Sequence, residues 1–341
     1  MAVSARGSRP EVRGIDLGRL AALTRSRSAQ FLFTAVFGVL VAVLAFMAAR
    51  RFAATPWPLS RGNPGLFVAA GGLSLLGYTL KAYGWERLFA AEERPRPLAL
   101  VAALGGASIT ALALPGRFDD VVRIAIVRRF RDCPAGVKAL CLSLVMLGLI
   151  DAVALAPLAL VAALLPGHAI ALRVGLVLLA GVGVVAAVVV VAMPSMAATK
   201  LLLRFRLGRW LRPRTTSLRD ALEALAFVSA CWLSRIVGLF LLLGALGIGF
   251  SFTLALVFLC ASSAAAALPV GPGGTATQAG AGAAALIASG VGASDAVAVA
   301  LASQAVGLLV GGAILLVATA WRTGVRLVPR YRVAPAAAIS R

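Results

Sequence analysis

Charged residues are scarce in this chain of 341 residues, and acidic residues are the scarcest of all. Aspartate and glutamate together number 12, against 33 lysines and arginines, and charged residues make up only 13% of the sequence. Hydrophobic residues make up 61%, which is more apolar surface than the core of a soluble chain of this length can bury. The composition therefore excludes an ordinary soluble domain and indicates a polytopic helical membrane protein.

Side chains for catalysis or metal binding are equally few. The chain has one histidine and four cysteines, and no two of these cysteines form a Cys-x-x-Cys pair. An enzyme acting on a lipid phosphate usually needs a metal-binding acidic cluster or a catalytic histidine or cysteine, and neither is evident. We therefore expect no catalytic residues, no metal site, no disulfide and no cofactor.

The net charge of +21 would suggest nucleic-acid binding in a soluble protein. Here the basic residues fall between apolar runs, and no aromatic-interleaved platform accompanies them. We expect no nucleic acid among the partners, and we interpret the basic residues as markers of membrane orientation.

Apolar runs of sufficient length to cross a bilayer follow one another along the chain. A helix of about 20 residues rises roughly 30 Å, which is the thickness of the hydrocarbon core. The first run is too long for the apolar part of a signal peptide, and no small-residue cleavage site follows it, so we expect it to be the first span. We expect about six full spans, over 28–49, 62–80, 139–165, 174–194, 224–246 and 296–320.

Basic residues are concentrated in five segments, which hold 28 of the 33 lysines and arginines: 1–28, 81–96, 117–138, 195–222 and 321–341. Because cytoplasmic loops carry an excess of lysine and arginine, we expect these segments and both termini to lie in the cytoplasm. The predicted organisation is a basic cytoplasmic segment over 1–27, a transmembrane domain over 28–321 and a basic cytoplasmic tail over 322–341, in the cell (plasma or inner) membrane.

This orientation requires two apolar stretches to enter and leave the membrane on the same side. The run 97–116 lies between two cytoplasmic segments and ends at the helix-breaking turn Leu114-Pro115-Gly116. The stretch 252–290 must likewise turn back from the outer side, at Leu268 to Gly274. Because backbone at membrane depth must be buried in protein or line a water-filled cavity, two re-entrant hairpins imply an internal cavity.

A long helix before and after each hairpin gives two units of the same design, 62–165 and 224–320, in opposite orientations. Inverted repeats of this kind occur in many transporters. The alternative is that 97–116 packs as a surface helix, or that 252–269 and 275–290 cross the membrane fully. The expected fold class is therefore all-α, a transmembrane helical bundle of about six spans with two re-entrant helical hairpins in an inverted repeat.

The charged residues that follow the first turn form a candidate binding site. Arg117, Asp120 and Arg123 are spaced three apart and share a helix face, and Asp119 is placed to pair with Arg123 at i,i+4. Arginine donors match a phosphate, and a helix N-terminus adds unpaired amides, so we expect an anionic lipid headgroup here. In the alternative, the aspartates neutralise the arginines and only fix the hairpin, or the arginines touch cytoplasmic phosphates from a helix at the interface.

Two further candidate residues, Asp151 and Arg235, fall near the centres of their spans. A charge there costs at least about 2.5 kcal/mol, so each side chain should face the protein interior and have a partner. The partners open to them are each other or the group around Arg117, and a purely structural ion pair is the alternative. The glycine-rich turn at Gly273 and Gly274, followed by Gln278, opens a second half-helix whose amides could also meet a polar headgroup.

The first motif resembles a known family. The run Leu114 to Arg123 is similar to the signature Pro-x-Arg-x-Gly-Glu-x-x-Arg of the lysylphosphatidylglycerol synthase transmembrane-region family, whose members carry a flippase-like domain. Leu268 to Gly280 resembles the family's Leu-Pro-x-x-Pro-Gly-Gly followed by Glu-Ala-Gly, and Asp151 falls where the family has an aspartate in the next span. The resemblance covers roughly residues 28 to 321 and implies movement of lipids between leaflets.

The sequence departs from the family pattern at two places. Asp119 and Asp120 stand where the family has Gly-Glu, and Gln278 stands where the family has a glutamate. If that glutamate serves a coupled proton or ion step, this chain moves a different substrate or works without the coupling.

We therefore expect a lipid flippase or transporter for an anionic phospholipid or a lipid-linked headgroup. The alternatives are a membrane enzyme acting on lipid phosphates and a scaffold or accessory subunit of envelope-lipid biosynthesis. No soluble domain follows Trp321, so the aminoacyltransferase half of some relatives is expected to be absent, and we expect no enzyme activity. The expected partners are membrane lipids, together with a second copy of the chain or an envelope-lipid enzyme.

Overall fold

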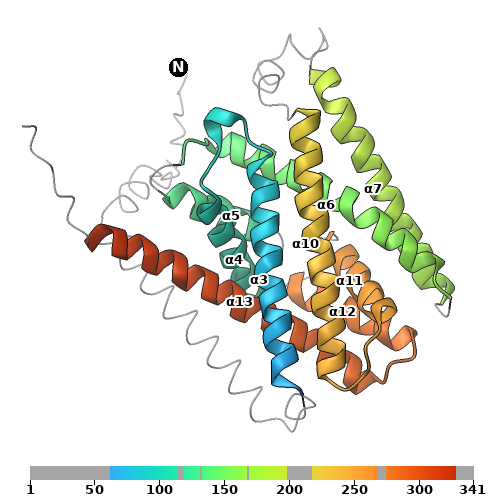
Figure 1. The fold of residues 1–341 in the computed structure, drawn as a ribbon. Helices are drawn as coiled ribbons and strands as arrows, with labels where there is room; N and C mark the ends of the chain where they lie inside the picture. The colour runs from blue at the N-terminus through green and yellow to red at the C-terminus, as the bar shows by residue number, and fades with distance from the viewer. Residues whose placement is uncertain are drawn as a thin grey trace, which may run out of the picture. The chain divides into compact units, whose positions relative to one another are not determined.

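The computed structural model describes residues 62–113, 118–130, 133–166, 169–197, 217–267 and 274–327. Over these residues the chain forms nine α-helices and one short 3-10 helix, η2 (Ala91–Glu93), without any strand (Figure 1). The expected all-α transmembrane class is confirmed. Five helices are long and apolar enough to cross a membrane: α3 (Pro64–Glu86), α6 (Val137–Leu164), α7 (Ile170–Ala197), α10 (Leu218–Ala245) and α13 (Ala293–Leu327).

These five helices coincide with five of the six expected spans, and the sixth, 28–49, lies outside the described residues. Local capping explains where two of the helices begin. The Asn63 side chain accepts a hydrogen bond from the Gly65 amide ahead of α3, and the Ser217 hydroxyl accepts one from the Asp220 amide ahead of α10. The largest correction concerns the end of α3, which continues to Glu86, so that Lys81 belongs to the helix and not to the following loop.

Four shorter helices form two helical hairpins. In the first, α4 (Pro97–Ala113) packs against α5 (Phe118–Arg129), and in the second, α11 (Phe252–Ala267) packs against α12 (Gly274–Ala288) (Figure 1). The longest of these helices has 17 residues and rises about 25 Å, which is less than the hydrocarbon thickness of roughly 30 Å. The expected turns at 114–116 and 268–274 lie outside the described residues, except for Gly274.

The order of a long helix, a hairpin and a second long helix occurs twice. The first unit runs α3, α4, α5, α6 and the second runs α10, α11, α12, α13, with α7 between them. The packing follows the same rule in both units. Helix α13 packs on α4 of the first hairpin, and α6 packs in the same way on α11 of the second, while α3 contacts α4 as α10 contacts α11. Exchanging one unit for the other therefore reproduces the main contacts.

The first helices of the two units, α3 and α10, lie side by side and run antiparallel (Figure 1). At one end the Asn63 amide donates to the Ala245 carbonyl at 3.2 Å, and at the other end Arg87 pairs with Glu223 at 3.0 Å. Between them the Ser234 hydroxyl donates to the Leu73 carbonyl at 2.7 Å. The first helices of the two units therefore run in opposite directions, as an inverted repeat requires.

Close backbone contact fixes the first hairpin against the last helix of the second unit. A Cβ atom added to Gly105 of α4 would lie 2.9 Å from the carbonyl oxygen of Gly311 on α13, and one added to Gly311 would lie 2.8 Å from the carbonyl oxygen of Gly105. Small residues allow helix backbones to approach each other in this way in membranes, where packing replaces the hydrophobic effect as the main source of helix association.

Replacing Gly311 by alanine is expected to lower the free energy of unfolding by about 1–3 kcal/mol, because the added methyl group must push α4 and α13 apart. Thermal unfolding of the purified protein in detergent, followed by tryptophan fluorescence, measures the effect. Gly312 is the matched control, since nothing lies within 4 Å of its Cβ position, and Gly312→Ala should unfold at or slightly above the wild-type temperature. Equal unfolding temperatures for the two variants would contradict the close contact.

Candidate functional site

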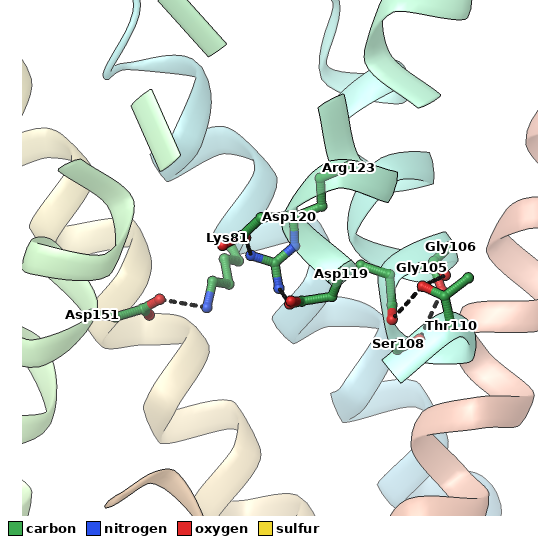
Figure 2. Close-up of polar contacts among 10 residues, drawn as sticks. Lys81, Gly105, Gly106, Ser108, Thr110, Asp119, Asp120, Arg123 and Asp151 are labelled. Atoms are coloured by element: carbon green, nitrogen blue, oxygen red, sulfur yellow. Dashed lines mark hydrogen bonds and ion pairs between the residues drawn. The ribbon is translucent and has the colours of Figure 1, made fainter. Parts of the chain in front are cut away.

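The charged residues of the first motif lie at the start of α5. The Nη1 atom of Arg123 lies 2.8 Å from Oδ1 of Asp120, and its Nη2 atom lies 2.8 Å from Oδ2 of Asp119 (Figure 2). Because α5 begins at Phe118, both aspartates fall in its first turn, where the helix dipole favours negative charge. The i,i+4 pair of Asp119 and Arg123 is present as the sequence spacing predicts. We call Asp119, Asp120 and Arg123 the α5 triad.

The α5 triad carries two carboxylates for one guanidinium, so its formal charge is negative. Arg117, the other arginine of the motif, lies outside the described residues. The arrangement in α5 corresponds to the alternative in which the aspartates neutralise Arg123. The triad alone is therefore poorly suited to attract an anionic headgroup.

A second charged group lies where α3, α6 and α10 meet, and it includes two residues that the sequence did not single out. The Nζ atom of Lys81 on α3 lies 2.6 Å from Oδ2 of Asp151 on α6 (Figure 2). Asp151 therefore pairs with Lys81 and not with Arg235. The two side chains are only 18% and 22% exposed, so little water competes with their attraction. We call Lys81, Asp151, Trp232 and Arg235 the charged junction.

Trp232 of α10 links the two cations of the charged junction. The Nζ atom of Lys81 lies 5.8 Å from the centroid of the Trp232 ring, and Cζ of Arg235 lies 5.1 Å from the same centroid. Both distances are within the range of cation–π attraction. Arg235 has no acidic partner among the described residues, so its contact with the ring takes the place of the ion pair expected for it.

Arg235 lies on the buried side of α10 although its own side chain is exposed. Residues four and seven positions away share a helix face. At those positions stand Val228, Cys231, Leu239 and Leu242, which are between 0% and 7% exposed. The lipid-accessible side of the helix is marked instead by Leu233, which is 55% exposed. The Arg235 side chain is therefore accessible, although its neighbours on the same face of α10 are buried.

Lys81 and Asp151 also occupy the buried faces of their helices. The residues four positions before and after them are all buried: Gly77, Trp85, Leu147 and Leu155. Two buried polar atoms of the charged junction, Oδ1 of Asp151 and Nε1 of Trp232, make no hydrogen bond. The charged junction thus has one unused acceptor, one unused donor and a formal charge of +1.

The remaining predicted residues stand apart from these two groups. Gly273 lies outside the described residues, and Gly274 is the first residue of α12. The side chain of Gln278 is half-buried in α12, and no hydrogen bond or ion pair joins it to the α5 triad or to the charged junction. Within the described part of the chain, no three His, Cys, Asp or Glu side chains are grouped so as to hold a metal ion.

Lys81 and Trp232 are the residues that reading the sequence missed. Lys81 ends an apolar run, which predicts a loop at this position, although Ala82 to Trp85 continue the run with no further charge. Trp232 stands three residues before Arg235 in the same expected span, and that spacing places the two side chains on neighbouring turns of one face. The spacing of Trp232 and Arg235 was therefore a signal in the sequence that could have identified Trp232.

Apolar helices of spanning length, with ionisable side chains paired between them, define a multi-pass membrane protein. The sequence matches the family described as lysylphosphatidylglycerol synthase TM region over residues 28–314, and the chain belongs to this family. Membership relates the protein to lipid metabolism or transport. Neither the curated proteins nor the solved structures included a match to the sequence.

Breaking the pair of Lys81 and Asp151 should destabilise the protein, because the remaining charge is left in an apolar setting. We expect Lys81→Met and Asp151→Leu each to lower the free energy of unfolding by about 1–3 kcal/mol, and the double variant to lose less than the sum of the two. Unfolding temperatures of the four proteins in detergent give this double-mutant cycle.

The matched control for this cycle is Arg219→Gln on the same bundle. Arg219 is 89% exposed and pairs with Glu223 at 3.1 Å, so its loss should change the free energy of unfolding by less than about 1 kcal/mol. Additive losses for Lys81→Met and Asp151→Leu would show that the two side chains do not depend on each other.

Proposed function

We propose that this protein is a lipid transporter that moves an anionic phospholipid, or a lipid-linked headgroup, between the two leaflets. The observation that carries the proposal is the position of the charged junction, which lies where the first helices of two antiparallel units meet. Substrate sites of transporters built from inverted repeats lie at the repeat interface near the middle of the membrane. Ionisable side chains within spanning helices commonly mark such pathways.

The family to which the chain belongs supports a lipid as the substrate. The proposal assigns transport to this chain and not catalysis, with membrane lipids as its partners. The protein partner that we propose is a second copy of the chain or an enzyme that makes the lipid.

The proposed topology places α4–α5 and α11–α12 as re-entrant hairpins that enter from opposite sides of the cell membrane, with both termini in the cytoplasm. Three observations support it. The hairpin helices are shorter than the hydrocarbon thickness, both hairpins pack on a long helix of the other unit, and 28 of the 33 lysines and arginines stand in the five sequence segments that this topology places on one side.

The topology can be tested with single cysteines placed in a variant that lacks the four native cysteines. We expect Arg94→Cys to react with a membrane-impermeant thiol reagent only after the cells are opened, because Arg94 lies in the loop before α4, on the side assigned to the cytoplasm. Ser294→Cys, at the exposed start of α13, should react in intact cells. Outside labelling at Arg94→Cys would overturn the assignment of the first hairpin.

The proposed function can be tested in vesicles with fluorescent phosphatidylglycerol, by dithionite quenching of the outer leaflet. We expect the purified protein to speed movement between leaflets relative to protein-free vesicles. Arg235→Gln should reduce the rate roughly ten- to hundredfold, since a charge-assisted hydrogen bond is worth about 1.5–3 kcal/mol. Arg219→Gln serves as the control for loss of an exposed arginine. A wild-type rate equal to that of protein-free vesicles would refute lipid transport by this chain.

A further inference from the structure

We infer that the charged junction binds the single phosphodiester group of the transported lipid, with Arg235 as its principal cation, and that the α5 triad does not hold this group. The inference rests on the proposed function and specifies the substrate for it. The net charge of the charged junction, the exposure of Arg235 and two buried atoms without hydrogen bonds support it.

The charges of the two groups differ in sign. Lys81 and Arg235 face one carboxylate, Asp151, so the charged junction carries one uncompensated positive charge. A phosphodiester carries one negative charge and restores neutrality, which matters because a net charge is costly inside a membrane protein. In the α5 triad, by contrast, Arg123 already pairs with two carboxylates, those of Asp119 and Asp120.

The surroundings of Arg235 leave its guanidinium available to a ligand. The stem of the side chain passes over Gly77 of α3, where an added Cβ would lie 3.7 Å from Cγ of Arg235. The guanidinium contacts the Trp232 ring and has no carboxylate partner in the described residues. It is also exposed within an otherwise buried helix face, so an anion can reach it. Arginine presents a planar fork of donors that matches phosphate oxygens.

Two buried atoms of the charged junction lack hydrogen-bond partners of the kind that a headgroup supplies. Trp232 is only 6% exposed, and its N–H makes no hydrogen bond, so it lacks the acceptor that a phosphate oxygen supplies. Oδ1 of Asp151 lacks a donor, which a headgroup hydroxyl or ammonium supplies. The excess of one positive charge favours a headgroup whose only charge is the phosphodiester. We therefore assign a hydroxyl-bearing headgroup, as in phosphatidylglycerol, in preference to the zwitterionic phosphatidylethanolamine.

The test is a titration of the purified full-length protein in detergent with phosphatidylglycerol and, separately, with phosphatidylethanolamine, with bound lipid counted by native mass spectrometry. The wild type should bind phosphatidylglycerol at least tenfold more tightly. Arg235→Gln should weaken phosphatidylglycerol binding roughly ten- to hundredfold, because it removes a charge-assisted hydrogen bond. Arg235→Lys should weaken binding less, because lysine keeps the positive charge. Trp232→Phe, which keeps the ring and loses the N–H, should weaken binding roughly two- to tenfold.

Arg219→Gln, at an exposed position on the same helix, is the matched control and should bind as the wild type does. Unfolding temperatures show whether each variant is folded. If Arg235→Gln does not fold, the binding affinities of Arg235→Lys and Trp232→Phe test the inference instead. Wild-type affinity in Arg235→Gln, or in both of these milder variants, would overturn the inference. Equal affinity of the wild type for the two lipids would also overturn it.

Movement of fluorescent phosphatidylglycerol, measured on the same preparations, separates this inference from the proposed function. Binding that depends on Arg235 in a protein that moves no lipid refutes the transport proposal and supports the site. Movement by the wild type, with unchanged binding in Arg235→Gln, refutes the site and supports transport.

Discussion

Antiparallel packing of α3 on α10 is the contact on which the rest of the structure depends. Hydrocarbon provides no hydrophobic drive for two apolar helices to associate, so close packing and polar contacts must hold them together. Gly84 permits the close approach, since a Cβ there would lie 3.1 Å from the carbonyl oxygen of Ala224. Charged pairs such as Arg87 with Glu223 fix one end. Because these helices begin the two units, their contact sets the opposed directions of both units.

The same packing determines where the charged side chains meet. Lys81 follows Gly77 by one helical turn on α3, so its ammonium reaches toward α6 and α10 at the level of Trp232. Helix α6 is held against α3 by a second polar contact, from the Trp85 indole N–H to the Ser143 hydroxyl at 2.9 Å. Both contacts are stronger in a low-dielectric setting than they would be in water. The three helices can therefore separate only by exposing unpaired polar groups.

Much of the fold follows from local properties of the sequence, but the charged junction does not. Apolar length predicts five helices of membrane-spanning length that the structure contains, and the spacing of Asp119 and Arg123 predicts their pair, because both features need only helix geometry. The pair of Lys81 and Asp151 joins residues 70 positions apart. Which residues form this pair depends on which helices pack together. The spacing of residues within one helix does not show which helices pack together. The exposure of Arg235 on a buried face likewise results from the packing of several helices.

The two charged groups differ in how their charges are satisfied, and this difference separates a structural role from a binding role. In the α5 triad both ion pairs join residues of one helix, so they persist however the helices move relative to one another, and one buried donor, Nε of Arg123, makes no hydrogen bond. In the charged junction the contacts join three helices from two units, and one donor, one acceptor and one positive charge are left over. A ligand that supplies the missing partners stabilises the arrangement in which these helices converge. Such a ligand therefore binds this arrangement more tightly than any arrangement in which α3, α6 and α10 have shifted apart. A ligand can shift a protein between two conformations only through such a difference in affinity, and transport requires a change of conformation.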